Sequence, residues 1–279
     1  MLDSHRVIAV TLAGRRPYLE ILAAYSLRDR GVIDEHHLWV NTAQPQDVAY
    51  LHGLAGRFPD YFRIVPARVP PGPGAYAHFY RPCQEPGTLY LKLDDDICFI
   101  ERGAVAGLLD FRLRHPDYFL VSGNVVNTFM TSHVYQTRGL LDHRRGTAAW
   151  DPFSPVSWAG GGFAEYVHRT FLAACEDGLE AWRFPTVEVR QRLSINVVCW
   201  RGEDFAAFDG VVGGDDEPWL SEVKPRELGR CCALQGGGLF AHFAYFTQRA
   251  HLEGTDLLSR YRALCVRECP ELPVLEGEP

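Results

Sequence analysis

The sequence predicts an α/β fold with a mixed, mostly parallel central sheet flanked by helices. Almost continuous apolar runs, such as residues 6–13, are typical of strands that a parallel sheet buries on both faces. Strand and helix patterns alternate from the start of the chain in the order β-α-β-α-β, which is typical of a doubly wound sheet. No internal repeat and no linker interrupts the chain, so we expect one domain.

The first five elements are marked by hydrophobic spacing and by breakers. Gly14 and Pro17 end the first apolar run, and Gly31 closes the helical pattern that follows. We expect strands at 6–13, 37–42 and 61–67, with helices at 18–31 and 47–58.

The rest of the chain is less regular. Residues 66–75 hold four prolines and two glycines and are expected to form a loop. Pro116 should stop one helix, and Pro218 suits the first turn of another. We expect helices at 75–84, 99–116 and 218–229, strands at 88–93 and 117–127, loops at 131–165, a strand and a helix within 187–208, and an apolar aromatic segment at 239–253.

Composition excludes several classes of protein. The 279 residues are 47% hydrophobic and 23% charged, which is ordinary globular usage. A net charge of −7 argues against a general nucleic-acid binder. No apolar run approaches the roughly 20 residues that span a bilayer, and the first residues make a poor signal peptide. We therefore expect a cytoplasmic protein whose eight cysteines, which form no CxxC pair, are reduced thiols.

The strongest chemical signal is the segment LKLDDDICFIE, in which Asp94, Asp95 and Asp96 follow an apolar strand. Ligands bind at the carboxyl ends of strands in open α/β sheets. Because side chains alternate along a strand, Asp94 and Asp96 should point the same way. Such paired oxygen ligands suit Mg²⁺ or Mn²⁺. The alternative is an acidic turn, or a cluster capping the helix expected at 99–116.

These segments, in this order, resemble the nucleotide-sugar-dependent glycosyltransferases of the GT-A fold, specifically the family 2-like members that carry an Asp-x-Asp motif. The resemblance covers residues 6 to about 250. Besides the aspartates it rests on the segments TLAGRRPYL after the first strand, SWAGGGFAEY at 157–166, GGDDEPWLSE at 213–222 and LFAHFAY around His242. It implies one catalytic domain over 1–270, followed by an acidic tail at 271–279.

The resemblance also implies roles for individual residues. A divalent cation, Mn²⁺ or Mg²⁺, would be held by Asp96 and His242 with Asp94 beside them, although a histidine in an aromatic strand is commonly a core residue. Asp216, or Glu217 as second choice, would take the proton of the acceptor hydroxyl. The remaining residues would bind the nucleotide-sugar donor: Thr11, Ala13, Arg15, Asn41, Arg81, Asp94, Asp95, Gly161 and Gly162.

The implied reaction moves a sugar from a nucleotide sugar to a hydroxyl group on a small molecule or glycan, with inversion as the first choice and retention as the alternative. UDP is the nucleotide expected from family frequency. One alternative is a nucleotidyltransferase that synthesises a nucleotide sugar. Such enzymes carry a glycine-rich loop after the first strand, and only Gly14, Arg16 and Pro17 match that pattern here. The other is a sugar-binding module without turnover. Binding that requires nucleotide and metal together would favour the transferase.

Overall fold

A computed structural model describes residues 5–66, 70 and 76–270. Within this part of the chain, one nine-stranded sheet has the order β3-β2-β1-β4-β8-β6-β9-β5, and β7 also pairs with β9. Strands β1 to β4 are mutually parallel where they pair, whereas β8 is antiparallel to β4 and β6. The strands are β1 (Arg6–Ala13), β2 (Glu35–Val40), β3 (Phe62–Val65), β4 (Thr88–Leu93), β5 (Ile97–Ile100), β6 (Tyr118–Val126), β7 (Val187–Val189), β8 (Val197–Arg201) and β9 (Cys231–His242).

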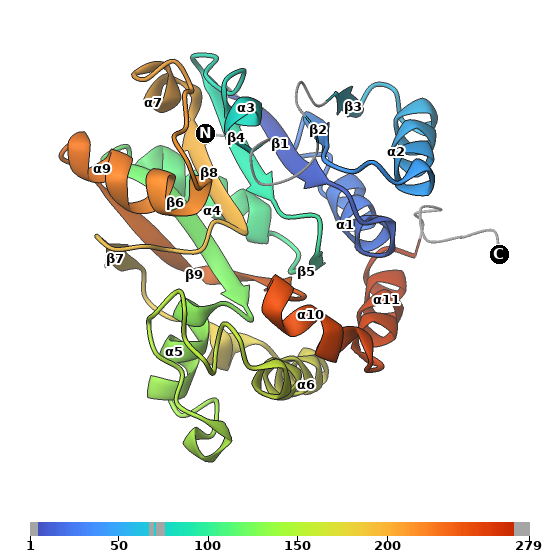
Figure 1. Cartoon of the computed structure of the whole chain (residues 1–279), viewed down its shortest axis with the longest axis vertical. Coiled ribbons are helices and arrows are strands. Elements are labelled where there is room, and N and C mark those ends of the chain that lie inside the picture. The colour runs from blue at the N-terminus through green and yellow to red at the C-terminus, as the bar shows by residue number, and fades with distance from the viewer. Residues whose placement is uncertain (1–4, 67–69, 71–75, 271–279) are drawn as a thin grey trace.

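Helices flank this sheet. Helix α4 packs against β6, β8 and β9, and α1 packs against β5 and α11. The arrowheads of β4 and β6 point to the end of the sheet where α10 lies (Figure 1). The helical elements are α1 (Arg16–Arg28), α2 (Pro45–Arg57), α3 (Tyr76–Tyr80), α4 (Ala104–Arg114), α5 (Phe129–Thr137), η3 (His143–Arg145), α6 (Gly161–Asp177), η4 (Glu180–Trp182), α7 (Gly202–Ala206), α8 (Asp216–Pro218), the π-helical η5 (Trp219–Val223), α9 (Lys224–Glu227), α10 (Phe246–Glu253) and α11 (Leu257–Glu268).

The predicted fold class is confirmed, and so is the opening alternation of strands and helices. Two local predictions are wrong. Residues 97–100 form β5 rather than the approach to a helix, because this apolar run pairs antiparallel with β9. The region 131–165 also holds most of α5 and the start of α6. In α6, Phe163, Val167 and Phe171 recur at helical spacing and are buried, and this burial outweighs the loop signal of the three glycines before them.

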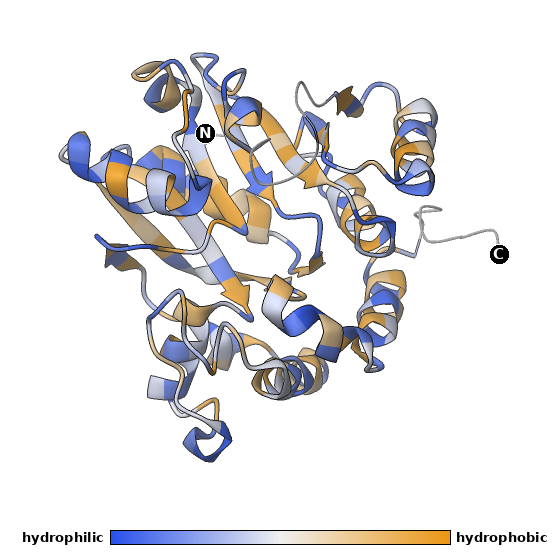
Figure 2. Cartoon of the chain, viewed as in Figure 1, coloured by the Kyte–Doolittle hydropathy of each residue, from blue (hydrophilic) through white to orange (hydrophobic). Residues whose placement is uncertain are grey.

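The sheet is apolar at its centre and polar where the site forms. Strands β1, β4 and β8 are mostly hydrophobic, and β4 becomes hydrophilic at its carboxyl end (Figure 2). All six residues of β4 are buried, Lys92 among them. The aspartates that follow β4 therefore sit on a rigid, buried strand, at the sheet edge that the sequence predicts.

Strand β9 places His242 at the same end of the sheet as the aspartates that follow β4. Gly236, Gly237 and Gly238 lie inside this strand. A Cβ atom at Gly236 would lie 2.0 Å from the carbonyl oxygen of Phe184, so only glycine permits this close backbone approach. The strand then continues through Phe240 and ends at His242, which pairs with Ile97 of β5.

The remaining expectations concern thiols, membranes and the chain end. All eight cysteines lie in described residues and are free thiols. In the described ranges no helix combines the length and the apolar character needed to cross a bilayer. The expected tail at 271–279, and most of the loop at 66–75, lie outside the described residues.

Candidate active site

The three aspartates after β4 have different surroundings. Asp94 is the most accessible of them, and both of its carboxylate oxygens accept hydrogen bonds, one from Lys92 Nζ and one from Asn196 Nδ2 at 2.7 Å. Lys92 also donates to the carbonyl oxygen of Ile195 at 2.9 Å. Burial lowers the pKa of Lys92, but the negative charges of Asp94 and Asp216 together have the larger effect. The pKa of Lys92 is therefore raised. Lys92 therefore remains a buried cation that fixes Asp94.

Asp95 points to the loop that follows β1. It accepts hydrogen bonds from the backbone N–H of Gly14 at 3.1 Å and from the guanidinium of Arg15, with which it forms an ion pair. Burial raises the pKa of Asp95 to about 6, and Arg15 opposes this rise. No helix begins at the aspartates, because α4 starts at Ala104 after a left-handed Gly103. Asp95 thus positions Arg15 and does not cap a helix.

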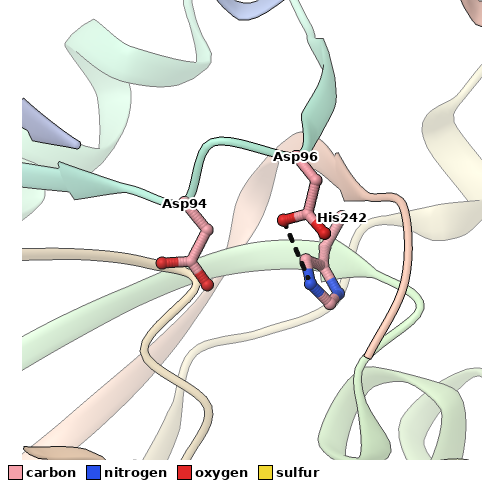
Figure 3. Close-up of side chains that lie close together, drawn as sticks. All are labelled: Asp94, Asp96 and His242. Carbon is pink, nitrogen blue, oxygen red and sulfur yellow. Dashed lines mark ion pairs between the residues drawn. The ribbon is translucent and has the colours of Figure 1, made fainter. Parts of the chain in front are cut away.

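Asp96 and His242 face each other. The two side chains are almost completely buried, and His242 Nε2 lies 3.4 Å from Asp96 Oδ1 (Figure 3). The other imidazole nitrogen, Nδ1, lies 3.4 Å from the carbonyl oxygen of Asn127. A carbonyl can only accept, so we assign the proton to Nδ1, which leaves the lone pair of Nε2 facing Asp96.

The donor set formed by these residues fits a divalent cation. One atom each from Asp94, Asp96 and His242 lies within 4.8 Å of the others, and the three side chains converge (Figure 3). Asp96 Oδ1 is buried and accepts no hydrogen bond. Two carboxylates and one imidazole, the latter oriented by a backbone carbonyl, are a common protein environment for a divalent metal ion.

The triad opens into a cavity of about 740 Å³ at the carboxyl end of the sheet, a volume typical of small-molecule sites. Its described lining includes two more carboxylates than lysines and arginines, so its formal charge attracts a cation. Two arginines offset the negative charge of Asp96, because Arg15 Nη1 and Arg249 Nη2 each lie 3.2 Å from Asp96 Oδ2. Guanidinium groups in such a cavity suit phosphate oxygens.

Asp216 and Glu217 line the same cavity at the start of a helical segment. Asp215 caps that segment by accepting from the backbone N–H of Glu217. Asp216 accepts a hydrogen bond from Tyr80 Oη at 2.7 Å, and burial raises its pKa. Glu217 accepts from Arg192 Nε at 2.7 Å, and burial raises the pKa of Glu217 to about 7. Both carboxylates therefore hold protons more readily than exposed ones.

The structure brings together most of the residues predicted for the site. Eight of the thirteen predicted residues line the cavity, and five of the donor-binding predictions lie elsewhere. Those that line the cavity are Arg15, Asn41, Asp94, Asp95, Asp96, Asp216, Glu217 and His242.

Five predicted donor-binding residues do not line it. Thr11 is buried and hydrogen-bonds to His36 at 2.8 Å, and Ala13 is fully buried at the end of β1. Arg81 lies in a separate hollow beside Pro66 and His78. Gly161 and Gly162 form the first turn of α6, where a Cβ at Gly161 would meet the side chain of His251. Alternation along β1 turns the side chains of Thr11 and Ala13 into the core, and helix formation at 161 places Gly161 and Gly162 in α6.

Several cavity residues were not predicted. Lys92 could have been found, because it shares a strand face with Asp94. Asn196 and Arg192 come from an irregular segment before β8 and carry no sequence signal. Arg249 lies one helical turn into α10, a helix that the sequence does not separate from the preceding strand.

Comparison with known proteins identifies the fold. No protein-family model and no curated protein sequence matches the chain. Solved structures do. GalNAc-T7 with UDP, GalNAc and Mn²⁺ gives a TM-score of 0.56 at 10% identity, over 95% of this chain and 48% of that one. Glucosyl-3-phosphoglycerate synthase from Mycobacterium tuberculosis with phosphoglyceric acid gives 0.50 at 16% identity, over 96% and 81%.

Residues 1–349 of S. aureus TarS with UDP-GlcNAc give a TM-score of 0.50 at 11% identity, over 95% of this chain and 66% of that one. The chain thus spans about half the length of GalNAc-T7 and larger parts of the other two. At these identities the likeness is one of fold: the chain has the GT-A fold found in glycosyltransferases, as the sequence resemblance implies.

Proposed function

We propose that this chain is a metal-dependent glycosyltransferase that moves a sugar, with inversion, from a nucleotide sugar to a hydroxyl acceptor. One observation carries the proposal. The cluster of Asp94, Asp96 and His242 opens into the same cavity as two carboxylates of raised pKa, Asp216 and Glu217. A metal cluster and a separate acid–base group are the two parts that such a transfer needs. One solved structure of the same fold, that of GalNAc-T7, holds UDP, GalNAc and Mn²⁺, which supports this assignment.

Asp94, Asp96 and His242 would hold Mn²⁺ or Mg²⁺. When bound, the cation supplies positive charge opposite the diphosphate of the donor, whose negative charge grows as the sugar leaves. The protein adds positive charge of its own on the same wall. Arg15 and Arg249, now paired with Asp96, lie where they can exchange that contact for phosphate oxygens.

The donor nucleotide would lie beside β1 and β2. Arg15 and Asn41 line the cavity where these two strands end, and Asp95 fixes Arg15 through its ion pair. A planar guanidinium and an amide can hydrogen-bond to base, ribose or phosphate groups. We propose UDP as the nucleotide, which makes it the first probe.

For the base, the surroundings favour Glu217 over Asp216, although the sequence suggests the reverse order. Asp216 is held on two sides, by the hydroxyl of Tyr80 and by the charge of Lys92. Glu217 has one arginine partner and a pKa of about 7. A general base works best when its pKa lies near the working pH. Glu217 is therefore proposed to accept the proton of the attacking hydroxyl, and Asp216 to support it.

Melting temperatures measured with UDP, GDP, CDP and dTDP, each with and without Mn²⁺, test the proposal. A transferase should be stabilised only when one nucleoside diphosphate and the metal are both present, because binding to the native state raises its stability. Stabilisation by sugars alone would indicate a sugar-binding module. Release of pyrophosphate from a nucleoside triphosphate and a sugar 1-phosphate would indicate a nucleotidyltransferase. Either result would contradict the proposal.

A further inference from the structure

Two exposed aromatic side chains border the cavity. Six large hydrophobic side chains are exposed in the described residues, and only Phe153 and Phe246 among them are aromatic. They are 62% and 72% exposed, and both line the cavity. A large exposed aromatic ring costs free energy in water, and an exposed apolar surface beside a cavity commonly marks a binding site.

Trp158 joins these two rings into one surface. Its ring centroid lies 5.8 Å from that of Phe153 and 5.4 Å from that of Phe246, with both pairs packed edge to face. Trp158 also lines the cavity. We call these three residues the aromatic platform. Edge-to-face packing holds rings in a fixed relation to each other, so the platform is a shaped surface and not three separate side chains.

Hydrogen bonds fix the backbone under the platform. Thr247, the residue after Phe246, donates from Oγ1 to the carbonyl oxygen of Trp158 at 2.6 Å. The buried Gln248 donates to the carbonyl oxygen of Ser157 at 3.2 Å. The buried Ser154 accepts from the backbone N–H of Ser157 at 3.2 Å. The start of α10 and the segment before α6 are therefore tied together, and a ligand would find the surface already built.

The platform lies on the side of the cavity where the proposed base stands. The guanidinium of Arg192 is 5.3 Å above the ring of Phe153 and also donates to Glu217 Oε1. Arg15 and Asn41, which would bind the nucleotide, lie beside β1 and β2, whereas Phe246 begins the helix after β9. The shared contact of Arg192 with Phe153 and Glu217 places the platform beside the proposed base, which is the position of an acceptor.

We propose that the aromatic platform of Phe153, Trp158 and Phe246 binds the sugar ring of a carbohydrate acceptor and presents one of its hydroxyl groups to Glu217. This inference rests on the proposed function and names its acceptor class. The C–H groups on one face of a pyranose carry partial positive charge and match the negative face of an aromatic ring. Arg192 and Glu217 offer hydrogen bonds to the hydroxyl groups at the rim of the same ring. A small acyclic acid would use the arginine but leave the platform uncovered.

Saturation-transfer NMR tests the platform directly. The probes are methyl glycosides of glucose, mannose, galactose and N-acetylglucosamine, with 3-phosphoglycerate as an acyclic hydroxyl compound for contrast. We expect transfer to ring C–H protons of at least one glycoside, and a dissociation constant about tenfold higher in both Phe153→Ala and Phe246→Ala. Val266→Ala is the matched control, because Val266 is also exposed but lies on α11, outside the cavity lining.

Glycoside binding that is unchanged in both phenylalanine variants would overturn the proposal. Binding of 3-phosphoglycerate alone, or no binding of any probe, would overturn it as well. A loss of the stabilisation by UDP and Mn²⁺ in the same variants would also overturn it, by assigning the rings to the nucleobase. The glycosides are measured with and without UDP and Mn²⁺. A wild-type protein that binds glycosides through these rings but binds no nucleotide would retain the platform and refute the proposed transferase.

Discussion

His242 Nε2 and Asp96 Oδ1 lie 3.4 Å apart in a buried position. This distance is too long for a good hydrogen bond and short enough for both atoms to bind the same metal ion. The sequence separates these residues by about half of the chain, and the antiparallel pairing of β5 with β9 brings them together, with Ile97 opposite His242. Because Asn127 orients the imidazole from its other side, this pair is a preformed element of the candidate site.

Asp96→Asn should abolish the combined stabilisation by UDP and Mn²⁺. The substitution keeps the size of the side chain and removes the charge that faces His242, Arg15 and Arg249. The melting temperature with UDP should then be the same with and without Mn²⁺. Asp110→Asn, on the exposed surface of α4, is the control and should respond like the wild type. A metal-dependent shift that persists in Asp96→Asn would remove this residue from the metal site.

His242→Ala should fold and should need at least about tenfold more Mn²⁺ for half-maximal activity, because losing a ligand weakens metal affinity at least as much as losing its hydrogen-bonding partner. The measurement is activity against Mn²⁺ concentration, together with the melting temperature. His36→Gln provides a buried-histidine control and should lower the melting temperature while the metal requirement stays unchanged. If His242→Ala behaves like the control, His242 is a core residue.

Glu217→Gln should lower kcat by about 10²-fold or more, which is typical for loss of a general base, while UDP binding is retained. In the wild type the rate should fall as the pH drops through about 7, because the carboxylate that accepts the proton then becomes protonated. The fall should be absent from the residual activity of Glu217→Gln. Asp216→Asn is measured beside it. A larger loss and a changed pH profile in that variant instead would return the role of base to Asp216.

The stability of the fold should depend on pH through His36. This histidine is buried between Thr11 and Ser26, each at 2.8 Å, and burial lowers its pKa to about 3. In the unfolded chain its pKa is about 6.5. Below that pH only the unfolded state gains the proton, so the free energy of unfolding falls by about 1.4 kcal/mol per pH unit until the folded-state pKa is reached.

Urea unfolding of the wild type and of His36→Gln at pH 7 and pH 5 measures this contribution. The destabilisation caused by the substitution should be about 2 kcal/mol smaller at pH 5, because the wild type alone has lost stability through His36. Equal differences at the two pH values would show that His36 is not held neutral in the folded protein.

The sequence by itself determined the fold class and two of the three residues of the candidate metal cluster. Continuous apolar runs and their breakers are local signals, and they placed β1 to β4 and the helices between them. Asp94 and Asp96 could be predicted because the end of a buried strand, and the alternation along it, fix where adjacent side chains point. The roles of His242, Asp216 and Glu217 were predicted from the family resemblance in the order of segments. That order gives no information about where the three side chains lie in space.

The tertiary structure alone decided which side chains share the cavity. Thr11 and Ala13 lie at the carboxyl end of β1, as expected, but their side chains face the core. Lys92 lies within β4, and its amine reaches the cavity because Asp94 and the carbonyl group of Ile195 hold it there. Arg192, Phe153 and Trp158 come from irregular segments, and Phe246 comes from the start of α10. Their positions depend on contacts with residues far away in the sequence. Local propensity determines where strands and helices form. Which loops lie next to one another depends on the order of the strands in the sheet, and packing between elements that are distant in the sequence sets that order.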